Sequence, residues 1–101
     1  MEEVSKIFDE IKKKSHKSKE EIEKDLNKVI HVAHNSLNSA LAKAKKEGKD
    51  VKDVEKEVDE LLKRFKNLRE KTDKMSMNDI RVTMLKYTKK VEDLLKKLGG
   101  K

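Results

Sequence analysis

The stretch from Val51 to Met75, VKDVEKEVDELLKRFKNLREKTDKM, decides the fold of this chain. Its apolar and small side chains recur at alternating intervals of three and four residues, which places them along one side of a helix. The positions of this series are Val51, Val54, Val58, Leu61, Phe65, Leu68, Thr72 and Met75. An unbroken heptad pattern of this length predicts a helix that packs against others with left-handed crossings.

A second heptad series follows the first and predicts another long helix. Its members are Met77, Ile80, Met84, Tyr87, Val91, Leu94 and Leu98. Helical spacing also relates the expected core residues of the first half, which are Val4, Ile7, Phe8, Ile11, Ile22, Leu26, Val29, Ala33, Leu37 and Leu41. A hydrophobic fraction of 34% lies near that of disordered chains, but periodic placement of the apolar residues favours a folded chain. We therefore expect one all-α domain over residues 1–101.

Capping residues indicate where the helices begin and end. Gly48 suits a left-handed cap at a helix C-terminus, and Asp50 can cap the next helix. Either Ser76 or Asn78 can cap the last helix, which Gly99 and Gly100 end. These signals predict helices at about 2–14, 18–47, 51–74 and 78–98. The connections are short, so successive helices should be antiparallel.

The first helix has two alternative descriptions. Ser18 and Glu21 have the spacing of a capping box, which favours a break at residues 15–18. However, Ile11, Ser15, Ser18 and Ile22 keep helical spacing through this segment, as one long bent helix would require. The expected fold is an antiparallel bundle of three long helices plus a shorter N-terminal helix, or with one long bent first helix.

Composition argues against most enzymatic and membrane functions. The chain has no Cys and no Pro, and its three glycines form no phosphate-binding loop. No nucleophile motif occurs, so we expect no enzyme and no cofactor. His31 and His34 have a spacing that could share a metal, but a site needs further ligands, so we expect none. Charged residues make up 47% of the chain, which predicts a soluble, cytoplasmic-type protein without a membrane segment.

The order of charged residues on the expected helix surfaces resembles that of a known class of protein. Acidic residues precede basic ones by four positions in pairs such as Glu10–Lys14, Asp59–Lys63 and Glu92–Lys96, the favourable order on a helix. With the heptad cores, glycine near helix ends and the absence of Pro and Cys, the whole chain resembles a computationally designed helical bundle. The resemblance implies a recombinant scaffold or protein binder and identifies no partner. A lysine-rich natural protein from a thermophile is the alternative.

One departure from this pattern is the run VIHVAHNSLNSALA, residues 29–42, which contains no Asp, Glu, Lys or Arg. At the overall charged fraction of 47%, these 14 positions would hold six or seven charged residues. The run is either a helix centre buried on several sides or a recognition surface. In the second interpretation, His31, His34, Asn35 and Asn38 form an exposed stripe that binds a protein partner; we call these four residues the His/Asn stripe.

A second departure lies beside the last heptad series. Three of the four methionines fall between Met75 and Met84, and Val82 and Leu85 flank the predicted core positions. These residues either form a wide core face between two neighbouring helices or form an exposed apolar patch that docks a partner. The same patch could let the chain self-associate weakly, with a monomer as the alternative.

The excess of basic residues indicates an alternative function. The net charge is +7, and the densest basic segment is KKKSHKSK, residues 12–19. No aromatic residue lies within it for base stacking, and only three arginines occur in the chain. These features predict non-specific attraction to nucleic acid, so the alternative to a protein-binding scaffold is a small basic nucleic-acid-associated helical protein.

Overall fold

The computed structural model describes residues 2–99, and the side chains of residues 4–99, as an all-α bundle. Its helices are α1 (Glu2–Lys13), α2 (Lys19–Lys46), α3 (Lys52–Lys71) and α4 (Met77–Lys97), with a short 3₁₀ turn, η1 (Thr72–Lys74), after α3. The predicted antiparallel bundle with a shorter N-terminal helix is confirmed. The alternative of one long bent first helix is wrong, because residues 14–18 are not helical.

The break between α1 and α2 follows from its capping residues. Ser18 Oγ accepts a hydrogen bond from the Glu21 amide at 3.3 Å, as the predicted capping box requires. The Glu21 carboxylate accepts a hydrogen bond of 2.7 Å from the amide of Lys17. The first bond satisfies an amide in the first turn of α2 that the helix leaves unpaired, and the second satisfies the Lys17 amide just before the helix, so the chain turns here instead of continuing the helix.

Gly48 ends α2 as predicted. Its φ angle is +79°, a left-handed conformation that glycine adopts without a Cβ penalty. The Lys49 amide donates to the Ala44 carbonyl and the Gly48 amide donates to the Lys45 carbonyl, both at 3.0 Å. This pair of bonds forms a Schellman motif, which reverses the chain toward α3. Gly99, at φ +91°, follows the end of α4 and its amide donates to the Lys96 carbonyl at 3.0 Å; Gly100 lies outside the described residues.

The predicted caps of α3 and α4 are partly corrected. Val51, not Asp50, is the N-cap of α3, since the Val51 carbonyl accepts the first helical hydrogen bond, from the Glu55 amide at 2.7 Å. Asp50 still contributes, because its carboxylate accepts a hydrogen bond from the Lys52 amide at 3.2 Å. At α4 the cap is Ser76, whose Oγ accepts from the Asp79 amide at 3.1 Å; Asn78 lies within the helix.

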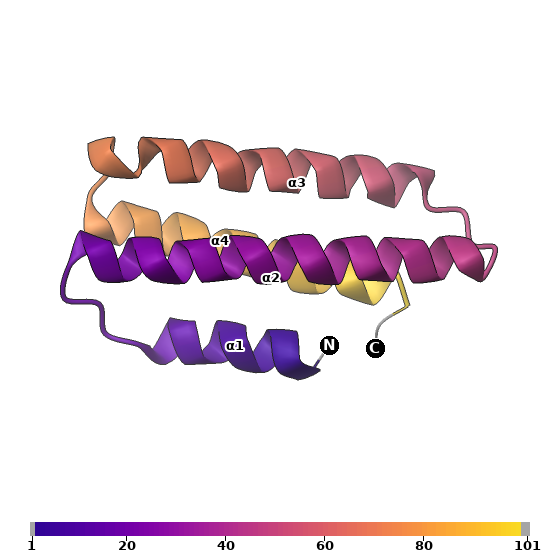
Figure 1. The fold of residues 1–101 in the computed structure, drawn as a ribbon, viewed down its shortest axis with the longest axis horizontal. Helices are drawn as coiled ribbons and strands as arrows, with labels where there is room; N and C mark the ends of the chain where they lie inside the picture. The colour runs from indigo at the N-terminus through magenta and orange to yellow at the C-terminus, as the bar shows by residue number, and fades with distance from the viewer. Residues whose placement is uncertain (1, 100–101) are drawn as a thin grey trace.

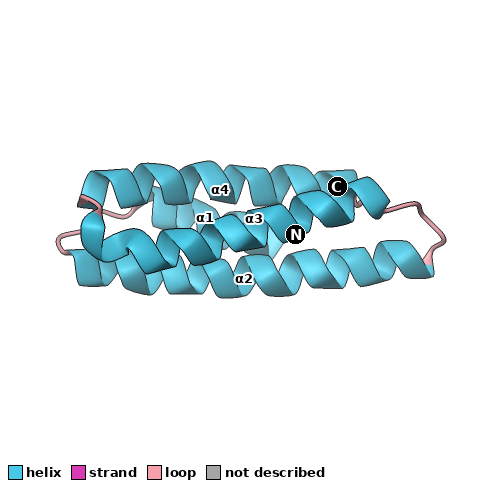
Figure 2. Cartoon of the chain, turned by 90° about the horizontal axis from the view of Figure 1, so that it is seen from above, coloured by secondary structure: helices cyan, strands magenta, loops and turns pink. Residues whose placement is uncertain are grey.

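The helices form three layers (Figure 1). α2 and α4 run parallel to each other through the middle, and α3 and α1 cover opposite sides of this pair. Figure 2, turned by 90°, shows α2 and α4 along opposite edges of the bundle. Successive helices are antiparallel, as predicted. α1 has 12 residues against 28 in α2, so it covers only part of the central pair.

Residues of both predicted heptad series line the core. Every member is buried or half-buried, and Phe65 and Tyr87 pack edge to face with ring centroids 5.3 Å apart. Ile7, expected in the core, is half-buried. The core also contains residues that the sequence analysis missed, namely Ala44, Thr88 and Leu95. Thr88 and Leu95 are buried because α4 packs against α1, α2 and α3, so a single heptad seam is too narrow to describe its buried face.

Two of the surface ion pairs join different helices. Lys45 of α2 pairs with Glu55 of α3, and Lys97 of α4 pairs with Glu57 of α3. Among the described side chains, none of the predicted i,i+4 pairs lies within 4.0 Å. Such exposed pairs contribute only about 0.3–0.5 kcal/mol, which is too little to hold two long side chains together. Within residues 2–99, none of the helices combines the length and the hydrophobicity that a membrane span requires.

Candidate functional site

The His/Asn stripe lies on the outer surface of α2. All four of its side chains are exposed, whereas Ala33 and Leu37 of the same segment are fully buried. The interpretation of residues 29–42 as a helix buried on several sides is therefore wrong for these four positions. The absence of charge at these exposed positions is not required by core packing.

Hydrogen bonds along α2 hold the stripe's side chains in place. The Asn35 amide nitrogen lies 3.1 Å from His31 Nε2, and the Asn38 amide nitrogen lies 3.2 Å from His34 Nδ1. An amide NH₂ can only donate, so the ring nitrogens are the acceptors. Each pair spans one helical turn, and together they restrict the rotamers of four surface side chains. A partly ordered polar surface loses less conformational entropy on binding.

A groove of about 550 Å³ between α2 and α3 borders the stripe at His34. Ile30 of α2 and Leu62 of α3, both half-buried, supply its apolar lining. Charged side chains of α3 complete the lining: Asp59, Lys63, Lys66, Arg69 and Glu70. The groove thus has an apolar centre and a charged margin, and His34 belongs to both the groove and the stripe.

The methionine-rich segment belongs mainly to the core. Met84 is fully buried, and Met75, Met77 and Leu85 are half-buried. Val82 is 57% exposed and is the one large apolar side chain on the surface of the described residues. The wide-core interpretation therefore accounts for this segment except at Val82 and the exposed edge of Leu85.

The two predicted sets of partner-binding residues do not form one surface. The stripe lies on the exposed side of α2, and Val82 and Leu85 lie on α4. α2 and α4 occupy opposite edges of the bundle (Figure 2). The two sets are therefore treated as separate candidate surfaces.

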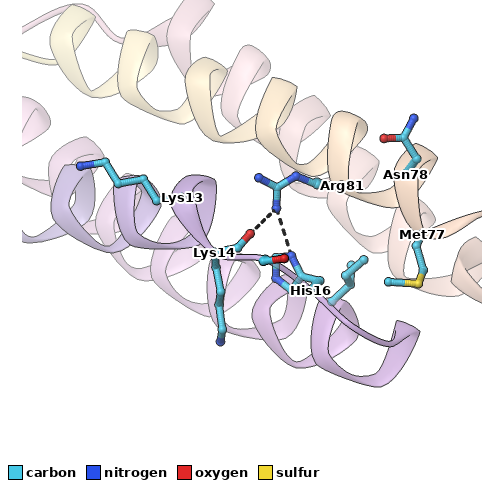
Figure 3. Close-up of a pocket in the computed structure, with 8 residues that line it drawn as sticks. Lys13, Lys14, His16, Met77, Asn78 and Arg81 are labelled. Carbon is cyan, nitrogen blue, oxygen red and sulfur yellow. Dashed lines mark hydrogen bonds between the residues drawn. The ribbon is translucent and has the colours of Figure 1, made fainter.

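The structure brings together a third group that the sequence analysis did not assemble. Arg81 of α4 donates hydrogen bonds to the backbone carbonyls of Lys12 at 2.5 Å and Lys14 at 2.9 Å. It donates a further bond of 3.0 Å to His16 Nδ1 (Figure 3). Arg81 thereby satisfies carbonyls at the C-terminal end of α1 and ties the α1–α2 connection to α4.

His16 connects this arginine to a buried carboxylate. Its side chain is 1% exposed, and its Nε2 lies 2.6 Å from Asp25 Oδ2. A guanidinium has donors only, so Nδ1 accepts from Arg81 and Nε2 carries the hydrogen that is donated to Asp25. Lys14 Nζ, 3.3 Å from the Asp25 carboxylate, completes the network.

One signal for this network was present in the sequence. Asp25 lies three residues after Ile22 and four before Val29, so it falls on the buried side of α2, where a carboxylate needs a partner. The sequence could not show that His16 and Arg81 are those partners. His16 lies in a connection without regular structure, and Arg81 is 56 positions beyond Asp25.

Neither metal-binding groups nor similarity to known proteins assigns a function to this chain. In the described part of the chain no group of three or more His, Asp or Glu residues could hold a metal ion. No protein-family model matches the chain, and no curated protein or solved structure is significantly similar to it.

Proposed function

We propose that this chain is a designed, non-enzymatic helical scaffold that binds a protein partner through the outer surface of α2. The observation that carries the proposal is the exposure of the His/Asn stripe in a chain that is 47% charged. A surface selected only for stability and solubility would carry Glu and Lys at such positions, because they are better helix formers. Uncharged polar residues there are easier to desolvate on contact with a partner.

The groove beside the stripe supports a protein as the ligand. Ile30 and Leu62 offer apolar contact area to a side chain of the partner, and the neighbouring His34 and Asn38 can form hydrogen bonds around it. An apolar centre bordered by polar groups is the usual arrangement of a protein interface. A partner helix that places one apolar residue in the groove would fit this arrangement.

A screen of displayed helical peptides against the intact chain tests the proposal. We expect enriched peptides to carry apolar residues at helical spacing and to bind the His34→Glu variant at least about tenfold more weakly, because its carboxylate would be desolvated in the interface. Asn67→Glu is the matched control, since Asn67 is exposed on α3 and does not line the groove. Peptides that bind both variants equally well, or no enrichment over the His34→Glu chain, would contradict the proposal.

Val82 and Leu85 provide a second candidate surface, for self-association. Val82 is well exposed on α4, and Leu85 lies one turn further along the same helix. We propose that any self-association uses this patch. Sedimentation of the wild type and of Val82→Lys over a range of concentrations tests this point: a concentration-dependent dimer that persists in Val82→Lys would exclude the patch.

Non-specific nucleic-acid binding is the alternative function, and the lysines of residues 12–19 favour it. Replacing Lys12, Lys13 and Lys14 by Gln should weaken binding to any duplex equally and flatten its salt dependence. Sequence discrimination that survives this triple change would favour the alternative over a protein-binding scaffold.

A further inference from the structure

The end of the bundle where α1, α2 and α4 meet contains a basic pocket of about 450 Å³. It is lined by Lys13, Lys14, Ser15, His16, Ile22, Met77, Asn78 and Arg81 (Figure 3). Three of these side chains are cationic, and no Asp or Glu is among the lining residues of the described chain. Since acidic residues number 20 in the chain, a pocket lined only by basic and neutral groups is a local departure from the mixed surface elsewhere.

Arg81 is held in place and still has donors to offer. Its three hydrogen bonds, to the carbonyls of Lys12 and Lys14 and to His16 Nδ1, use at most three of its five N–H groups. At least two N–H groups therefore remain for a ligand, and the half-buried side chain reaches the pocket. The protein contacts fix the guanidinium before a ligand arrives, so little side-chain entropy is lost on binding.

The other lining groups complement Arg81. Asn78, one turn earlier on α4, and Lys13, at the end of α1, also line the pocket; both are exposed, and in Figure 3 both side chains point away from the Arg81 guanidinium, so each would turn toward a bound ligand. Lys14 is already paired with Asp25, which leaves the positive charge of Lys13 and Arg81 without a carboxylate partner among the described residues. The pocket thus combines a fixed planar donor, Arg81, with two exposed side chains at its margin, Asn78 and Lys13.

We propose that this pocket binds a small organic phosphate monoester. A phosphate monoester carries a charge of about −1.5 to −2 at pH 7 and three strong acceptor oxygens, which suit the remaining N–H groups of Arg81 and the positive charge of the lining. Arg81 would bind two of the oxygens and Lys13 would neutralise the remaining charge. Met77 and Ile22 form an apolar part of the lining, which suits the carbon group of an ester. This site is distinct from the stripe on α2.

Titration of the intact chain with phenyl phosphate, followed by ¹H–¹⁵N NMR, tests the proposal. With sodium chloride added to hold the ionic strength constant, we expect saturable shifts of the Arg81 side-chain Nε–H and the Asn78 amide with a Kd of about 1 mM or tighter. Inorganic phosphate should shift the same signals but bind more weakly, because it lacks the apolar group. Small shifts that do not saturate, or that phosphate and chloride cause equally, would overturn the proposal.

Three variants locate the binding. Lys13→Gln should weaken phenyl phosphate binding at least about threefold, and it leaves the bundle intact because Lys13 is exposed. Arg81→Lys keeps the charge but loses the planar fork, so binding should fall by about tenfold or more. Lys86→Gln, an exposed change elsewhere on α4, is the control and should bind like the wild type. Equal affinity in all three variants would overturn the proposal, even if Arg81→Lys loosens α1.

A short DNA duplex separates this site from nucleic-acid binding by the lysines. If the pocket binds a monoester, phenyl phosphate should still bind saturably, with shifts at Arg81 and Asn78, when the duplex is present. Binding of the duplex with shifts at Arg81 and Asn78, together with no saturable binding of phenyl phosphate, would instead assign the pocket to a nucleic-acid backbone and overturn the proposal.

Discussion

Arg81 Nη1 lies 3.0 Å from Nδ1 of His16, a residue 65 positions earlier in the chain. This hydrogen bond and the two that Arg81 donates to carbonyls at the end of α1 join the shortest helix to α4. They lie at one end of the bundle, at the point where the chain leaves α1 and turns into α2. The contact therefore contributes mainly to the stability with which α1 is attached to the rest of the bundle.

Removing the Arg81 side chain beyond Cβ should loosen α1 more than the rest of the bundle. In Arg81→Ala, two carbonyls and His16 Nδ1 lose a donor, which we expect to cost about 1–3 kcal/mol. Hydrogen exchange should become faster in Glu2–Lys13 and remain nearly unchanged at the centre of α3. Arg69→Ala on the exposed side of α3 is the control. Uniform acceleration across all helices would contradict a local role for Arg81.

Asp25 should stabilise the fold through His16. In Asp25→Ala the buried Nε2–H of His16 loses its acceptor, so we expect a loss of about 1–3 kcal/mol in the free energy of unfolding. Asp25→Asn should lose less, since its amide oxygen can still accept from Nε2. Urea unfolding of the two variants measures the difference. Equal destabilisation would mean that the charge of Asp25, rather than its hydrogen bond, is what stabilises the fold.

The first heptad series predicts which apolar residues contribute most to the free energy of unfolding. Phe65 is fully buried and packs against Tyr87, and Leu61 is 2% exposed. Phe65→Ala and Leu61→Ala should each reduce the free energy of unfolding by about 2–5 kcal/mol, because each leaves a cavity at the centre of the bundle. Thermal or denaturant unfolding followed by circular dichroism checks this. Losses below about 0.5 kcal/mol in both variants would be incompatible with the core described above.

The His/Asn stripe should tolerate charge without loss of stability. His34 and Asn38 are exposed, so His34→Glu and Asn38→Lys, made singly, should change the free energy of unfolding by no more than about 0.5 kcal/mol. The lost side-chain hydrogen bond between them is offset by the better helix propensity of Glu and Lys. Denaturant midpoints measure the change. Strong destabilisation by both substitutions would show that the stripe serves the core and not a partner.

The turn after α2 should depend on the backbone conformation of Gly48. A Cβ at this position would meet no atom within 4 Å, so any penalty in Gly48→Ala comes from the left-handed φ of +79°. We expect a loss of about 1 kcal/mol for Ala and a smaller loss for Asn, which adopts this conformation more readily. Calorimetric melting temperatures of the two variants test the order. A more stable Ala variant would contradict the conformational argument.

The sequence by itself determined the helices and most of the core. Heptad spacing in residues 51–98 reports which side of each helix is apolar, and the caps at Ser18, Gly48 and Ser76 depend on neighbours within a few positions. Both kinds of signal are local, since a helix forms its own backbone hydrogen bonds. This is why the α1–α2 break, the helix order and the core residues of α3 could be predicted.

Only the tertiary structure decided which side chains are exposed and which distant residues meet. Whether residues 29–42 are buried depends on how many helices surround α2, and packing on α3 and α4 leaves His31, His34, Asn35 and Asn38 exposed. The meeting of Arg81 with His16 likewise depends on α1 folding back beside α4, which no spacing within one helix reports. Helical periodicity gives the direction of each side chain about its own axis. The positions of the neighbouring helices then determine whether that side chain meets protein or solvent.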